Sequence, residues 1–82
     1  MLVGLTWHED DGKLRAEVKK RDFVEAMAFV NRVAEVAEAV QHHPDIYIRW
    51  NTVMLALWTH TSGNVTDKDR DLAARIDAVL EP

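Results

Sequence analysis

A stretch without glycine or proline, residues 22–41, most constrains how this chain can fold. It is rich in Ala, Met, Val and Glu, and Asp22 followed by Glu25 resembles a capping box with Asp in the capping role. Pro44 then prevents continuation, because the residue before a proline is pushed out of the α region. The sequence therefore predicts one long helix within a chain of only 82 residues.

The apolar residues of this predicted helix form more than one stripe. Those predicted to face a sheet recur every three or four positions: Phe23, Met27, Val30, Ala34, Ala37 and Val40. A further set widens the apolar zone: Val24, Ala28, Val33 and Val36. Because exposed apolar patches often mark association sites, we predict a subunit interface there. A polar residue at Val33 or Val36 is expected to lower the oligomeric state.

Strand patterns precede the predicted helix. Residues 5 to about 9 suit a strand, and Asp10-Asp11-Gly12 supplies the chemistry of a tight turn. Residues 13–19 alternate strictly between apolar and charged side chains, which indicates a strand with one buried face and one solvent-exposed face. Together the two segments predict a β-hairpin.

Two further strands and a second helix are predicted after Pro44. Residues 46–50 and 53–59 are rich in β-branched and aromatic side chains. Alternation along the second of these places Val53, Leu55 and Leu57 on the core face, and it points His60 away from that face. A second capping box begins at Thr66. It opens a helix whose apolar stripe is Leu72, Ala73, Ile76, Val79 and Leu80.

The predicted fold class is α+β, a single domain over residues 1–82 in the order ββαββα, with helices packed on one face of a four-stranded antiparallel sheet. A core of this size is marginal. Since the chain has no cysteine for disulfides, self-association is expected. The 14 acidic residues outnumber 10 scattered basic ones, which disfavours nucleic-acid binding. No apolar run approaches the roughly 20 residues that span a bilayer, so we expect a cytoplasmic protein.

Three of the four histidines fall in two places, the stretch Gln41-His42-His43-Pro44 and His60. Each place has an ordinary explanation. The carbonyl end of a helix favours positive charge, and a single histidine at a strand end is commonly a surface residue. Their combination favours acid/base chemistry, because imidazole exchanges protons near neutral pH.

The other candidates also have structural explanations. Asp69 suits the capping box of the final helix, and Glu38 is placed to contact His42 one turn later. Trp50 and Trp58 are either packing residues or a stacking wall for a flat substrate. Three histidines and a carboxylate also fit a zinc site. Adjacent histidines followed by proline match no common zinc-ligand spacing, so the sequence favours a metal-free site, with zinc as the alternative.

The spacing of these residues resembles the pterin-4a-carbinolamine dehydratases, also called 4a-hydroxytetrahydrobiopterin dehydratases. The matching positions form a fixed series: Glu38, His42-His43-Pro44, Trp50, Thr59-His60 and Asp69. Further support comes from positions outside the series: Trp7, Asp22-Phe23 and Leu72-Ala73. The resemblance covers about residues 7–80.

The resemblance implies a hydro-lyase that removes water from a 4a-hydroxytetrahydropterin to give quinonoid dihydropterin, as part of tetrahydropterin recycling. It implies no metal and no bound cofactor, since the pterin is the substrate. It also implies a homodimer or homotetramer. The alternative within the same fold is a non-catalytic module that uses its long helix to bind another protein or to assist assembly.

The resemblance also implies a role for each candidate residue. His42 and His60 act as the acid/base pair, His43 binds and orients the substrate, and Asp69 orients or charges His60. Residues expected to contact or support the substrate are Glu38, Trp50, Trp58 and Thr59. Some relatives have small or polar residues where this chain has Trp58, which is therefore expected to narrow the pterin pocket.

Overall fold

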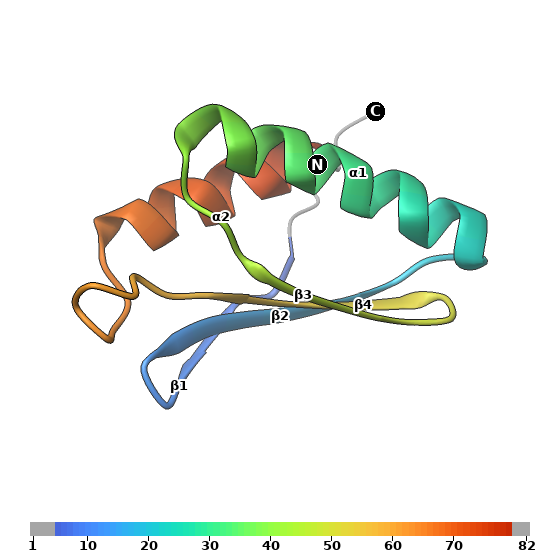
Figure 1. The fold of residues 1–82 in the computed structure, drawn as a ribbon. Helices are drawn as coiled ribbons and strands as arrows, with labels where there is room; N and C mark the ends of the chain where they lie inside the picture. Colours follow the sequence, from blue (N-terminus) through green and yellow to red (C-terminus); the bar gives the residue numbers. More distant parts are fainter. Residues whose placement is uncertain (1–4, 80–82) are drawn as a thin grey trace.

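The computed structural model describes residues 5–79 and arranges them as an α+β fold in the order ββαββα (Figure 1). The elements are β1 (His8–Asp10), β2 (Lys13–Lys19), α1 (Phe23–Val40), β3 (Asp45–Arg49), β4 (Thr52–Leu57) and α2 (Asp67–Val79). The predicted fold class and element order are confirmed. Neither helix, within the described residues, is long and apolar enough to cross a membrane.

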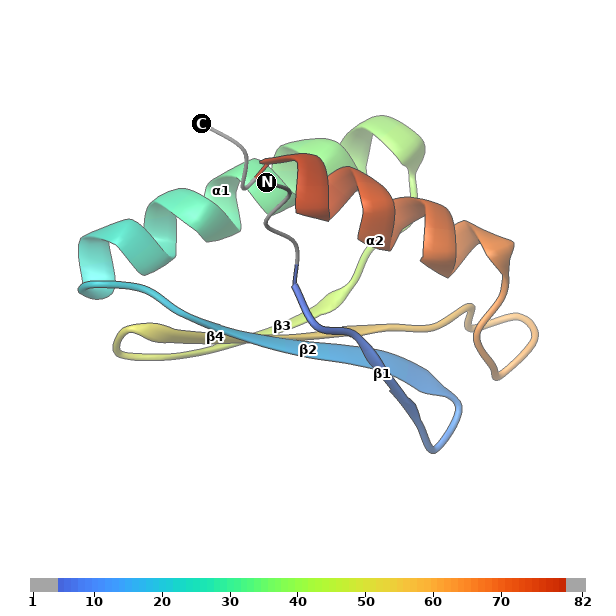
Figure 2. The same cartoon turned by 180° about the vertical axis from the view of Figure 1, so that it is seen from behind.

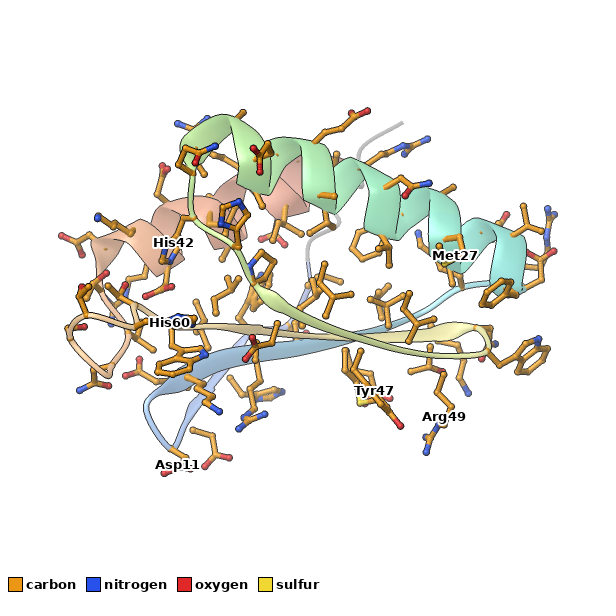
Figure 3. All side chains as sticks on the ribbon, in the orientation of Figure 1. Asp11, Met27, His42, Tyr47, Arg49 and His60 are labelled. Carbon is orange, nitrogen blue, oxygen red and sulfur yellow. The ribbon has the colours of Figure 1, made fainter. Side chains whose placement is uncertain are left out.

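The four strands form one antiparallel sheet in the order β1-β2-β4-β3. The central pair is β2 and β4, whose register runs from Leu14 opposite Leu57 to Lys19 opposite Thr52. Both helices cover the same face of the sheet, as the front and back views show (Figures 1 and 2). Side chains of the opposite face, such as Tyr47 and Arg49, extend away from the helices (Figure 3).

The core lies between this sheet and the two helices. The alternation predicted for β4 is confirmed, because Val53, Leu55 and Leu57 are buried. They pack in one cluster with buried residues of α1 and α2: Ala26, Phe29, Val33, Ala37, Leu72, Ala73 and Ile76. The predicted contribution of Leu80 lies outside the described residues.

Leu5 and Trp7, which precede β1, are tied to the final helix by one side chain. Asp77 of α2 accepts hydrogen bonds from the backbone N–H of Leu5 (3.0 Å) and the indole N–H of Trp7 (3.1 Å). Trp7 also packs against the core. These contacts hold the segment before β1 beneath α2.

The buried stripe of α1 differs from the predicted one. Ala26, Phe29, Val33 and Ala37 are buried, whereas Phe23 is 50% exposed and Ala34 is also exposed. The apolar residues of this helix are so numerous that several stripes fit the helical period, and packing against the sheet selects one of them. Val33 is fully buried, so its assignment to a subunit interface is wrong. Val36 is half-buried against the same core.

We predict that Val33→Thr lowers the free energy of unfolding by roughly 1–3 kcal/mol, because it places a hydroxyl in an apolar site without changing side-chain shape. The matched control is Val24→Thr on the same helix at a position that is 74% exposed, where the change should stay within about 0.5 kcal/mol. Urea unfolding of both variants provides the measurement. Equal free energies of unfolding for Val33→Thr and Val24→Thr would contradict the placement of Val33 in the core.

Candidate active site

The end of α1 presents the two adjacent histidines. Gln41 adopts the left-handed conformation (φ 54°, ψ 43°), and its backbone N–H bonds the carbonyl oxygens of Ala37 and Glu38. The N–H of His42 also returns to the Ala37 carbonyl at 3.1 Å. This pattern satisfies carbonyl groups that the helix end would otherwise leave unpaired. The chain therefore turns at Gln41, and His42 and His43 follow just past the helix.

His42 forms the central contact of the site with Asp69. Its Nε2 lies 2.5 Å from the Asp69 Oδ1, and Asp69 is fully buried in the first turn of α2. A carboxylate can only accept hydrogen bonds, so the Nε2 of His42 carries the proton. The Nδ1 is then the ring nitrogen that is left to exchange a proton with a substrate.

The second carboxyl oxygen of Asp69 is held separately. Oδ2 accepts a hydrogen bond from the Thr59 hydroxyl and another from the Thr66 backbone N–H, both at 2.8 Å. The Thr66 contact is the capping-box bond predicted for this helix. The hydroxyl oxygens of Thr59 and Thr66 lie 2.6 Å apart. Since Thr59 donates to Asp69, Thr66 is the donor in that pair.

These contacts decide the ionisation of Asp69. Burial by itself disfavours the charged carboxylate, but the hydrogen bonds from His42, Thr66 and Thr59 and the charge of His42 outweigh it, and the pKa of Asp69 lies below its usual range. The capping role and the contact with histidine coexist, because each uses a different oxygen.

His60 lies across the pocket from this pair and contacts a different residue. It is exposed in the segment after β4, and its ring centroid is 4.1 Å from that of Trp58 at an interplanar angle of 43°. The predicted pairing of Asp69 with His60 is wrong, since Asp69 binds His42. Strand alternation explains the difference: Thr59 continues the core face of β4 and meets Asp69, whereas His60 points to the other side.

His43 pairs with Glu38 at the surface. The His43 Nε2 lies 2.9 Å from the Glu38 Oε1, and Gln41 donates to the Glu38 Oε2 at 3.2 Å. The hydrogen bond from His43, the hydrogen bond from Gln41 and the charge of His43 together lower the pKa of Glu38. Glu38 was predicted to contact His42. It meets His43 because the chain leaves the helix at Gln41.

These residues surround one open pocket of about 250 Å³ at the end of the molecule where α1 stops and β4 ends. Figure 3 shows His42 and His60 at this end. The lining residues are Gln41, His42, His43, Trp58, Thr59, His60, Thr61 and Lys68. The structure therefore brings together the three predicted histidines, Thr59 and Trp58, with Asp69 behind His42.

Lys68 was not predicted as a site residue. It stands between the two acidic residues of the first turn of α2, and it is one of the residues that line the pocket. Its position next to Asp69 was the signal available in the sequence.

Trp50 is not part of this pocket. It is 66% exposed in the turn between β3 and β4, and that hairpin lies at the opposite end of the sheet from His42 and His60 (Figures 1 and 3). The geometry of this chain gives no support to its predicted contact with the substrate.

A larger hollow of about 440 Å³ lies elsewhere, on the open face of the sheet. It includes His8, the fourth histidine, together with Arg15 and Glu17. Among residues 5–79, no three histidine, aspartate or glutamate side chains converge as a metal site would require. The metal-free chemistry of the histidine pocket stays a prediction.

We predict that Asp69→Asn lowers the free energy of unfolding at pH 7 by roughly 1–3 kcal/mol, because it leaves buried hydrogen-bonding groups poorly matched. The pKa of Asp69 is lowered in the folded protein. Its ionisation therefore stabilises the fold at pH values above the pKa of an aspartate in the unfolded chain, about 3.9. That contribution to stability is lost as the pH falls through the pKa that Asp69 has in the folded protein. The gap between wild type and Asp69→Asn should therefore narrow below about pH 4.

Urea unfolding from pH 7 to pH 3 measures this gap. Asp67→Asn is the control, since Asp67 is a fully exposed neighbour in the same helical turn and should change stability by less than about 0.5 kcal/mol at pH 7. A gap that stays constant over the whole range would contradict the assignment.

Known proteins share both the sequence pattern and the fold. The family described as Pterin 4 alpha carbinolamine dehydratase matches residues 2–79. A protein of Mycolicibacterium vanbaalenii is 53% identical over 74 residues, which are 90% of this chain and 80% of that protein. One from Acidobacterium capsulatum is 54% identical with the same coverage. Both are named as pterin-4-alpha-carbinolamine dehydratases, with the assignment marked as provisional.

Solved structures agree with these relatives. A crystal structure of a transcriptional coactivator/pterin dehydratase from Brucella melitensis has a TM-score of 0.83 and 31% identity, covering 89% of this chain and 80% of the other. A pterin dehydratase-like protein identified as a RuBisCO assembly factor in the alpha-carboxysome has a TM-score of 0.75 and covers 96% of this chain and 92% of its own. At 21% identity, it shares the fold alone. This chain belongs to the pterin-4α-carbinolamine dehydratase family.

Proposed function

We propose that this chain removes water from a 4a-hydroxytetrahydropterin to give quinonoid dihydropterin, as a step in tetrahydropterin recycling. The observation that carries the proposal is the convergence of His42 and His60 on one pocket, with the buried Asp69 hydrogen-bonded to His42. Family membership supports the same reaction class. The pocket of about 250 Å³ is slightly smaller than typical ligand sites of roughly 300–1,000 Å³, so the substrate would remain partly exposed.

The reaction needs two proton movements. The hydroxyl on C4a gains a proton and leaves as water, while a ring nitrogen of the pterin loses a proton, so the net change is the loss of one water. A general acid and a general base placed on either side of the substrate accelerate such a step. His42 and His60 are the two groups that we assign to these transfers.

The other site residues support the histidines. Asp69 fixes the tautomer and ring orientation of His42, in the manner of a carboxylate behind a catalytic imidazole. The contact between His43 and Glu38 suits the binding and orienting role proposed for His43. We propose no metal and no cofactor in the reaction.

We predict that His42→Ala and His60→Ala each reduce kcat/KM by roughly 10²–10⁴-fold, the usual contribution of one acid or base. Dehydration of chemically generated 4a-hydroxytetrahydropterin provides the assay. His8→Ala is the matched control, because this histidine lies in β1 outside the pocket, and it should retain wild-type activity. Wild-type turnover no faster than buffer would overturn the enzyme proposal.

The rival function is a non-catalytic module that binds a protein partner. The RuBisCO assembly factor demonstrates that a dehydratase-like fold is used in assembly, but at 21% identity this likeness concerns the fold and not the activity. The same assay separates the two functions, since a purely binding protein would not dehydrate the substrate faster than buffer.

We also propose that the chain forms a homodimer or homotetramer. The large exposed apolar side chains that support this are Phe23, Val24, Ile46, Tyr47 and Trp50. They lie at the start of α1, on the edge strand β3 and in the turn that follows β3. An apolar surface of this kind commonly marks association.

We predict that Val24→Lys or Tyr47→Lys lowers the oligomeric state, because each places a charge on one part of this exposed surface. Light scattering measures the molar mass, and circular dichroism checks that each variant is folded. An unchanged mass in both variants would show that neither α1 nor β3 contributes to an interface.

A further inference from the structure

His60 is held differently from the other two histidines of the pocket. His42 is anchored by Asp69 and His43 by Glu38, each through a hydrogen bond to a carboxylate. Among residues 5–79, no hydrogen bond to the ring of His60 is found. The residue is exposed and follows the end of β4. An acid or base must nevertheless stay within a small distance of its proton partner, so something else has to hold this ring.

Trp58 is the aromatic neighbour that contacts His60. The two residues are separated by one position at the end of β4, which places both on the same side of the chain. Their ring centroids are 4.1 Å apart and the planes are tilted by 43°. This contact restricts the imidazole on one side, and both residues line the pocket.

Trp58 is itself fixed by residues from two neighbouring strands. Its indole N–H donates to the Asp45 carboxylate at 3.1 Å, and the Lys13 ammonium lies 5.1 Å from its ring centroid. Asp45 begins β3 and Lys13 begins β2. Both strands pair with the end of β4 at this point of the sheet. The indole is therefore clamped by a hydrogen bond and by a cation facing its ring.

We propose that Trp58 is a positioning residue that holds His60 for proton transfer, with Asp45 and Lys13 fixing the indole. The proposal rests on the function proposed above, in which His60 moves a proton. Trp58 was expected to act as a wall that narrows the pocket and contacts the substrate. The structure assigns it a second task, which acts through His60 and exists before any substrate binds.

The first test concerns the resting protein and needs no activity. At a centroid separation of 4.1 Å, the ring current of Trp58 should displace the imidazole C–H resonances of His60 in proton NMR spectra. In Trp58→Ala these resonances should move toward those of free histidine, while those of His8 stay in place. Trp58→Phe, which keeps an aromatic ring, should retain part of the displacement. Unchanged His60 resonances in Trp58→Ala would overturn the proposal.

The second test is a double-mutant cycle between Trp58 and His60. Trp58→Ala should lower kcat by up to roughly 100-fold, the cost of a misplaced group. In the His60→Ala background the same substitution should have almost no further effect on kcat. Trp58→Phe should recover much of the lost activity, which a general loss of stability would not explain.

The outcomes separate the possible roles of Trp58. A rise in KM with unchanged kcat, or an equal loss in the presence and absence of His60, would show that Trp58 acts by touching the substrate, and it would overturn the proposal. If the wild-type protein is inactive, the proposed function has failed. The NMR measurement then still decides whether Trp58 contacts the ring of His60 in the resting protein.

Discussion

The buried carboxylate of Asp69 is the contact on which the arrangement of the site depends. It joins His42 after α1, Thr59 after β4 and Thr66 before α2. A buried charge is costly unless it is fully hydrogen-bonded, and here each oxygen has its own donors. The described residues contain no buried side-chain nitrogen or oxygen without a partner. Three separate ends of secondary structure are thereby held in one place, and the pocket opens above them.

The site consequently has two halves that differ in their surroundings. His42 is supported from the core side of the sheet, through a carboxylate that also caps α2. His60 is supported from the other side, by the ring of Trp58 and the strands beside it. The end of β4 is the boundary between the halves, because Thr59 points inward and His60 outward. His42 and His60 line the pocket from the two sides of that boundary.

Much of this could be predicted from the sequence, because the signals were local. Capping residues at Asp22 and Thr66 set the helix starts, and alternation identified the β4 residues that pack into the core, Val53, Leu55 and Leu57. The buried stripe of α1 could not be chosen, since apolar residues fit several stripes and only packing against the sheet selects one. The partner of Asp69 depended on contacts between distant elements, and the resemblance assigned the wrong histidine. Trp50 matched the family spacing, yet its hairpin lies far from the pocket (Figure 1).

The position of Asp69 in the first turn of α2 has a consequence for how the protein responds to heat. Helix ends open at a lower free energy than the core to which they belong. Opening of this single turn would release His42 and separate Thr59 from its partner, while Leu72 and Ile76 remained packed in the cluster. The pocket can therefore lose its order before the domain unfolds. Loss of the His42–Asp69 contact and unfolding of the core are then expected as distinct transitions, with the loss of the contact at the lower temperature.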